Sequence, residues 1–130
     1  MAIVGVGIDL VDVARMKQAL DSGTLGERFK RRVFTDDERA YCEARGLQAA
    51  QSYAARFAAK EAVKKALGAR ARFGFAWPEI EVVRLSSGAP QIVLHGRTKA
   101  MAESMGASVI HLSLSHIEDV AVAHAVVERE

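Results

Sequence analysis

The chain has 130 residues, half of them hydrophobic, with 18 Lys or Arg against 16 Asp or Glu and a formal net charge of +2 at pH 7. This length predicts one domain, residues 1–130, with enough chain for a hydrophobic core, and the composition excludes a disordered protein. So small a charge excess does not indicate nucleic-acid binding, and no stretch is long and apolar enough to cross a bilayer, so we expect neither a nucleic-acid nor a membrane partner.

Residues 2–10, AIVGVGIDL, are β-branched and glycine-rich and predict a buried strand. Side chains alternate between the two faces of a strand. Over residues 3–11 this places Val4, Val6, Ile8 and Leu10 on one face, and Ile3, Gly5, Gly7, Asp9 and Val11 on the other. The two glycines leave space for another group to approach the backbone closely. Asp9 either caps the next helix or takes part in chemistry, and the strand alone leaves both interpretations open.

Helices are predicted through the rest of the first half, at 12–20, 27–34, 35–45 and 47–67. Asp12 is a candidate N-cap for the first. Thr35 and Glu38 have the spacing of a capping box, which predicts the start of the third. Gly46 and Gly68 are placed to end the third and the fourth.

The second half is predicted to contain two β-hairpins separated by a helix. The strand pairs are 80–85 with 90–96 and 108–115 with 120–127, and an amphipathic helix over 97–105 lies between them. The segment 69–79 is predicted to be an irregular connection. This order predicts an α+β fold with a mostly antiparallel sheet and one long central helix.

The long helix contains one carboxylate among several bases, in RFAAKEAVKKAL, residues 56–67. Residues four apart share a face, which gives two stripes: Phe57, Glu61 and Lys65 on one, and Arg56, Lys60 and Lys64 on the other. By itself Glu61 with Lys65 could be an exposed ion pair, which stabilises a helix by about 0.2–0.5 kcal/mol.

Asp9 and Glu61 together allow a second interpretation. Two carboxylates from separate elements are typical ligands of a hard cation such as Mg²⁺. Nearby Lys and Arg side chains would suit a phosphate-bearing substrate. A metal and cations around a phosphate are what phosphoryl transfer requires, because that chemistry depends on positioning and charge neutralisation.

The segment HLSLSH, residues 111–116, places His111, Ser113 and Ser115 on one face of a strand and leucines on the other. This polar face is either solvated or lines a ligand site. A serine hydrolase is a poor fit because no G-x-S-x-G motif is present. Zinc is also a poor fit, because the four histidines, at 95, 111, 116 and 124, follow no finger or H-E-x-x-H spacing.

Cys42 is the only cysteine, so no disulfide can form within the chain. With no histidine near it in sequence, we expect a packed rather than a nucleophilic thiol. The absence of disulfides suits a reducing compartment, and no basic segment precedes the apolar N-terminal run as in a signal peptide. We therefore expect a cytoplasmic protein.

Three segments, GVGIDLVDVARM, RFAAKEAVKKALG and HLSLSH, together resemble the holo-acyl-carrier-protein synthases, the short type of 4′-phosphopantetheinyl transferase. The similarity covers essentially the whole chain and includes SGAPQIVLHG, which resembles the family's Gly-x-Pro hairpin. The motifs G-[IV]-D and F-[AS]-x-K-E-A-x-x-K-A are specific when they occur at this separation in so short a chain.

The resemblance implies a phosphopantetheinyl transferase-like fold and transfer of the phosphopantetheine group of coenzyme A to a serine of apo-acyl carrier protein. Adenosine 3′,5′-bisphosphate would be released, and the reaction belongs to fatty acid biosynthesis. Asp9 and Glu61 correspond to the family's Mg²⁺ ligands, and Lys65 to the lysine at the reacting phosphate. These three are therefore the expected catalytic residues, with Glu61 a candidate for either metal ligand or base.

The same resemblance implies that Arg56 and His116 contact coenzyme A phosphates and that His111 lies in the same strand. Arg15 and the basic segment Arg28–Arg32 fall where the family meets the acidic carrier protein. The family is trimeric, with each active site between two subunits, so we expect a homotrimer.

The chain also departs from the family pattern. Lys64 occupies a position that is more often apolar, and helical spacing from Glu61 favours Lys65 as the functional lysine. His124 lies in a strand that usually has small or apolar residues there, and a structural histidine is expected. The segment 68–79 lacks the usual Gly-Thr-Gly, which leaves the adenine and 3′-phosphate contacts open.

Two other functions remain open from the residues alone. One is a module that binds an acidic partner without chemistry, and the other is a Mg²⁺-dependent nucleotide hydrolase.

Overall fold

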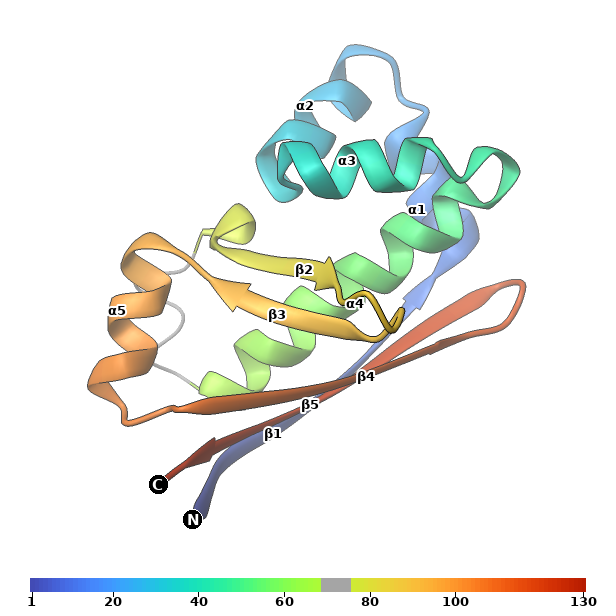
Figure 1. Cartoon of the computed structure of the whole chain (residues 1–130). Coiled ribbons are helices and arrows are strands. Elements are labelled where there is room, and N and C mark those ends of the chain that lie inside the picture. Colours follow the sequence, from blue (N-terminus) through green and yellow to red (C-terminus); the bar gives the residue numbers. More distant parts are fainter. Residues whose placement is uncertain (69–75) are drawn as a thin grey trace.

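The computed structural model describes residues 1–68 and 76–130, and it is an α+β fold as predicted (Figure 1). The strands are β1 Ala2–Asp12, β2 Ile80–Arg84, β3 Pro90–Leu94, β4 Val109–His116 and β5 Val120–Arg129. The helices are α1 Val13–Leu20, α2 Thr24–Val33, α3 Asp36–Glu43, α4 Ala49–Leu67 and α5 Gly96–Ser104, with 3₁₀ turns at Gly46–Gln48 and Trp77–Glu79. None of the helices in the described ranges is long and apolar enough to span a membrane.

The strands form two antiparallel sheets, one of three strands in the order β1-β5-β4 and one that is the hairpin β2-β3. Helix α4 runs between them, with α1, α2 and α3 gathered at its N-terminal end and α5 near its C-terminal end (Figure 1). The antiparallel arrangement and the long central helix were both predicted. The two hairpins also lie where the sequence predicted them.

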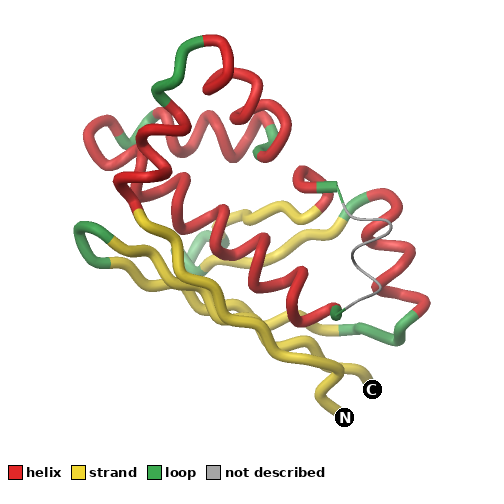
Figure 2. Tube along the Cα trace, turned by 180° about the vertical axis from the view of Figure 1, so that it is seen from behind, coloured by secondary structure: helices red, strands yellow, loops and turns green. Residues whose placement is uncertain are grey.

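The glycines of β1 allow α4 to lie directly on the strand (Figure 2). A Cβ built on Gly7 would lie 1.9 Å from the carbonyl oxygen of Ala62, and one on Gly5 would lie 2.0 Å from that of Ala66. The space predicted above this face is therefore filled by the backbone of α4. Its small side chains, among them Ala62 and Ala66, are almost fully buried at this contact.

The opposite face of β1 is exposed, so the prediction of a buried strand is wrong for that face. Val6, Ile8 and Leu10 are 58%, 60% and 69% exposed. A register irregularity between Ile3 and Gly5 places Val4 against the core instead of with these three. Alternation separated the two faces correctly from Gly5 onward, but it could not show which face is covered.

The capping residues of the sequence predicted most helix ends correctly. Asp12 caps α1 by accepting from the Arg15 amide at 3.0 Å, and Thr35 forms a capping box with Glu38. The short helix predicted at 27–34 is α2, which begins three residues earlier, at Thr24, and ends at Val33. Helix α3 ends at Glu43, two residues before the predicted end, because a 3₁₀ turn begins at Gly46.

A fully buried ion pair joins the helices to the hairpin. Lys60 Nζ lies 2.7 Å from Glu38 Oε1 and donates to the carbonyl oxygens of Trp77 and Ile80, at 3.1 and 2.6 Å. Glu38 also accepts from the Val82 amide at 2.8 Å. Lys60 therefore does not belong to an exposed charged stripe, and it fixes the start of β2 against α4.

Candidate active site

Asp9 and Glu61 line one pocket of about 400 Å³, at the junction of β1, α1 and α4. Arg15 of α1 and Phe57, one turn before Glu61 on α4, also line it. The strand supplies one carboxylate and the helix the other, because the glycine contact holds the two elements together. The pair predicted from sequence is thus brought to one place.

Lys65 completes this group, which we call the acidic pocket: Asp9, Glu61 and Lys65. The Lys65 ammonium lies 2.9 Å from Asp9 Oδ1 and 3.0 Å from the carbonyl oxygen of Ile8. It thereby offsets the charge of a carboxylate that is only 17% exposed. The Lys65 side chain itself is half exposed, so it remains accessible to a ligand.

Burial raises the pKa of the Glu61 carboxyl above its usual range. The positive charge of Lys64 opposes this rise, the negative charge of Asp9 adds to it, and Lys65 opposes it. A carboxyl group whose pKa is raised by burial and by a neighbouring carboxylate is a common feature of functional sites. Lys64 lies over the ring of Trp77, 5.5 Å from its centroid, yet it still acts electrostatically on Glu61.

The donor set of the acidic pocket fits Mg²⁺. This cation is usually held by one or two carboxylates together with water and substrate phosphates, which is what Asp9 and Glu61 would offer. Within residues 1–68 and 76–130, no group of three or more His, Cys, Asp or Glu side chains could hold a metal ion. A closed site for a softer metal is therefore not formed within the described part of one chain.

Arg56 and His116 line a different pocket of about 230 Å³, between α3, α4, the β2-β3 hairpin and the end of β4. The Arg56 side chain is 5% exposed and its guanidinium carbon lies 4.1 Å from the centre of the Tyr41 ring. Its Nε is buried without a hydrogen-bond partner in the described structure. A buried cation with an unpartnered donor at a pocket indicates an anion site.

Two further arginines that the sequence analysis missed surround the same tyrosine. Arg84 Nη1 donates to Tyr41 Oη at 2.5 Å, and Arg84 and Arg45 lie 5.3 and 5.9 Å from the ring centroid. With Arg56 they make up what we call the arginine pocket. No spacing links these residues, since they come from α3, the turn after it, α4 and β2. The only sequence motif that pointed to this pocket was the segment SGAP, because its Gly88 and Pro90 line it.

The acidic pocket and the arginine pocket share no lining residue. On α4, Arg56 and Glu61 are five residues apart, which puts them about 140° apart around the helix. Arg56 was expected to contact phosphates of the same substrate as Glu61 and Lys65, and the structure does not bring these three residues together within one chain.

The remaining histidines lie outside both pockets. His111 is exposed on β4, with Nε2 2.5 Å from Glu128 Oε1. His124 is exposed on β5 and has no hydrogen bond or ion pair within the described residues, so the expectation of a structural histidine is not met within one chain. Cys42 is fully buried, and burial raises the pKa of its thiol to about 12, as expected for a packed residue.

The basic segment Arg28–Arg32 divides between two environments on α2. Phe29 packs into the core, and Lys30 lies 3.3 Å from Glu43 with a side chain that is 16% exposed. The exposed members are Arg28, Arg31 and Arg32. These arginines, together with Arg15 at the acidic pocket, are the cations still available to a partner.

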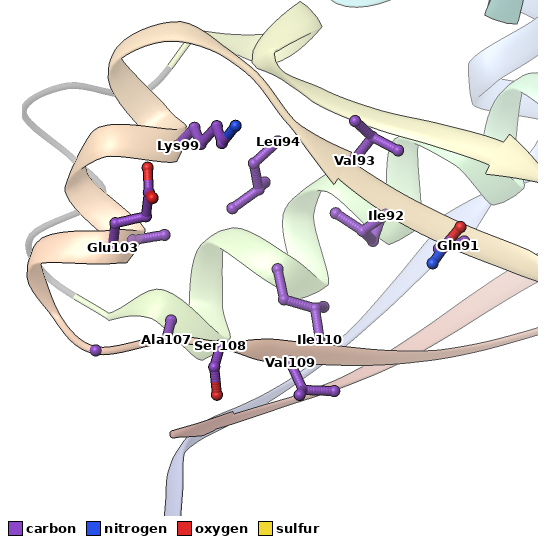
Figure 3. A pocket seen from close by; sticks show the side chains of 12 residues that line it. Gln91, Ile92, Val93, Leu94, Lys99, Glu103, Ala107, Ser108, Val109 and Ile110 are labelled. Atoms are coloured by element: carbon purple, nitrogen blue, oxygen red, sulfur yellow. The ribbon is translucent and has the colours of Figure 1, made fainter. Parts of the chain in front are cut away.

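A third pocket, of about 740 Å³, opens between β3, α5 and the start of β4 (Figure 3). Ile92, Leu94 and Ile110 form part of its wall, with Lys99 and Glu103 on the α5 side. It contains none of the site residues predicted from sequence.

Comparisons with known proteins identify the family of this chain. The model of the 4′-phosphopantetheinyl transferase superfamily matches residues 5–125. A holo-[acyl-carrier-protein] synthase of Beutenbergia cavernae is 47% identical over 127 residues, covering 98% of this chain and 99% of the relative.

Solved structures give the same result. A holo-[acyl-carrier-protein] synthase from Neisseria meningitidis superposes with a TM-score of 0.88 at 30% identity, covering 98% of this chain and 99% of that one. One from Bacillus anthracis, in complex with coenzyme A (3′,5′-ADP), has a TM-score of 0.78 at 30% identity, with both chains fully covered.

The match to the family model and the fold therefore define a phosphopantetheinyl transferase, and the chain belongs to that superfamily. Within it, the chain is a member of the holo-[acyl-carrier-protein] synthase family and thus an enzyme of the transferase class.

Proposed function

We propose that this enzyme transfers 4′-phosphopantetheine from coenzyme A to a serine of apo-acyl carrier protein, in a Mg²⁺-dependent reaction of fatty acid biosynthesis in the cytoplasm. The serine oxygen forms a bond to the pantetheine-linked phosphorus. The bond from that phosphorus to the bridging oxygen breaks, and adenosine 3′,5′-bisphosphate leaves. The observation that carries this proposal is the acidic pocket, in which Asp9, Glu61 and Lys65 meet beside Arg15.

Asp9 and Glu61 would hold the Mg²⁺ ion, which when bound neutralises charge on the pyrophosphate. Lys65 binds the transferred phosphate and shifts from Asp9 to reach it, since its side chain is half exposed. Glu61 has a raised pKa, which makes it a stronger base than an ordinary carboxylate. It serves as ligand or as the acceptor of the serine proton.

The arginine pocket would bind the phosphates of the nucleotide part of coenzyme A. Support comes from the unpartnered Nε of Arg56 and from the two further guanidinium groups, Arg45 and Arg84, around Tyr41. His116 lines the pocket and adds a ring nitrogen for the same phosphates. His111, further along β4, would contribute only at the margin of this site, because it is paired with Glu128.

The enzyme would act as a homotrimer with active sites between subunits. One chain carries the acidic pocket and the arginine pocket on different sides of α4, so a single coenzyme A would need both from neighbouring copies. The exposed apolar side chains of Val6, Ile8 and Leu10 give the copies a surface for association.

The acidic carrier protein would bind beside the acidic pocket. Arg15 lies at the pocket itself, and Arg28, Arg31 and Arg32 are exposed on the neighbouring helix α2. Cations around the site would steer an acidic partner and hold its serine near Lys65.

The test is to incubate the protein with coenzyme A, Mg²⁺ and apo-acyl carrier protein and to weigh the carrier by mass spectrometry. We expect the carrier to gain the mass of one phosphopantetheine group. When EDTA is present from the start and binds the Mg²⁺, we expect no gain. A module that only binds would leave the carrier mass unchanged. A nucleotide hydrolase would release products from coenzyme A without any carrier, and either result would overturn the proposal.

A further inference from the structure

The face of the three-stranded sheet turned away from α4 combines apolar and polar side chains in three cross-strand rows. We call it the outer face, and it comprises Val6, Ile8 and Leu10 of β1, Val122, His124 and Val126 of β5, and His111, Ser113 and Ser115 of β4. No other described element covers it, and the proposed trimer would associate through it.

His124 lies at the centre of this face. It is on β5, the middle strand, and its cross-strand neighbours are Ile8 on one side and Ser113 on the other. Along β5 the next outward residues are Val122 and Val126. The central position of a largely apolar surface is thus an imidazole.

This imidazole has no hydrogen bond or ion pair with any residue in the described ranges. His111 differs, because its Nε2 is bound to Glu128 at 2.5 Å. Burying an unpartnered polar group in an apolar interface is unfavourable, so the assembly needs a partner for each His124 ring.

Three-fold symmetry supplies that partner. Three sheets that turn their outer faces toward a common axis lie closest to it along their middle strands. Since His124 is the central residue of β5, the three copies of this side chain meet near the axis. The valines before and after it would form apolar layers that exclude water from the imidazoles.

We propose that the three His124 side chains of the trimer form one shared binding site for a divalent transition-metal ion such as Zn²⁺. This inference rests on the proposed trimer. Three neutral imidazole nitrogens with an open fourth position are a typical ligand set for Zn²⁺. The site is separate from the acidic pocket, because Asp9 points to α4 and its neighbour Ile8 lies on the outer face beside His124.

The experiment measures metal stoichiometry and mass together. The protein is stripped with EDTA, its mass is measured by sedimentation velocity, and Zn²⁺ or the spectroscopic probe Co²⁺ is then titrated. An Asp9→Asn background removes the acidic pocket as a competing site. We expect a trimer that binds one ion per three chains, with the visible absorption of four-coordinate Co²⁺.

Two variants identify the ligand. His124→Gln should bind the metal ion at least about 100-fold more weakly while it remains a trimer. His95→Gln alters a surface histidine away from the outer face and should bind the ion as tightly as the wild type. A trimer that binds no ion, or one in which His124→Gln binds as tightly, overturns the metal site and leaves the trimer standing. A monomer at all concentrations overturns both proposals.

Discussion

The ammonium group of Lys65 lies 2.9 Å from Asp9 Oδ1, although the two residues are 56 positions apart in the chain. This contact exists because α4 packs directly on β1 at Gly5 and Gly7. A strand with side chains at those positions would hold the helix farther away, and the lysine, Glu61 and Asp9 would no longer share a pocket. The glycines of the first strand are thus a structural condition for the chemistry of the site.

A methyl group at Gly7 should separate these elements. Its Cβ would lie 1.9 Å from the Ala62 carbonyl oxygen, a backbone atom that moves only with the whole helix. We expect Gly7→Ala to lower the free energy of unfolding by about 1–3 kcal/mol or more and to reduce transfer activity at temperatures where the variant is still folded. Urea unfolding and initial rates measure the two effects, and an unchanged stability would contradict the close packing described here.

The acidic pocket should be sensitive to each of its three members. Asp9→Ala, Glu61→Ala and Lys65→Ala should each lower transfer by at least about 100-fold, because the first two remove a proposed Mg²⁺ ligand and the third removes the cation that would bind the phosphate. Lys64→Ala should be much milder, since Lys64 lies over the ring of Trp77 and would not bind the reacting phosphate. Steady-state kinetics with folded variants, checked by circular dichroism, would show a misassigned lysine if Lys64→Ala were the more damaging change.

Replacing Glu61 should make the protein more stable while it removes activity. Burial raises the pKa of Glu61, so the folded state favours the protonated carboxyl. The stability gained from protonation is complete below the ordinary glutamate pKa of about 4.3 and is lost as pH rises through the raised value.

Glu61→Gln resembles the neutral form, so its melting temperature should exceed that of the wild type at pH 7–8. The difference should disappear near pH 4, and Mg²⁺ should reduce it at neutral pH by favouring the wild-type carboxylate. Melting curves across this pH range test the sign. A variant less stable than the wild type at pH 8 would mean that Glu61 is held by compensating contacts.

The starts of α1 and α3 and the pairing of strands in each hairpin could be predicted from the sequence, because capping and hairpin signals act over a few residues. Thr35 with Glu38 shows this, since the bond between them depends only on local geometry. The sequence could not show that Lys60 is buried. Its partner Glu38 is 22 positions away, and the β2-β3 hairpin covers both side chains. Helical spacing put Arg56 and Glu61 on different stripes of α4, but it could not show that each stripe lines its own pocket, because the pockets depend on which elements cover α4 on each side.

Removing one partner of the buried Lys60–Glu38 pair should destabilise the protein more than breaking any exposed ion pair among the described residues. Lys60→Met leaves a buried carboxylate without its cation, and we expect the free energy of unfolding to fall by about 3–5 kcal/mol. Adding Glu38→Gln should then cost much less than it does alone, because the charge left behind is removed. A double-mutant cycle by urea unfolding measures this coupling, and additive losses would show that the two side chains stabilise the fold independently.

Active sites between subunits predict that two inactive variants restore activity to each other. Asp9→Ala destroys the acidic pocket and Arg56→Ala the arginine pocket, and each homotrimer should be nearly inactive. When the two are unfolded together and refolded at equal amounts, some interfaces pair an intact acidic pocket with an intact arginine pocket. If subunits combine at random, one interface in four is of this kind, so transfer should recover to about a quarter of the wild-type rate.

The matched control mixes Asp9→Ala with Glu61→Ala, which both damage the acidic pocket and should give no recovery. This comparison separates true complementation from a stabilising effect of mixing. If each chain used its own two pockets, the Asp9→Ala and Arg56→Ala mixture would stay as inactive as its parents, because no chain in it carries both pockets intact.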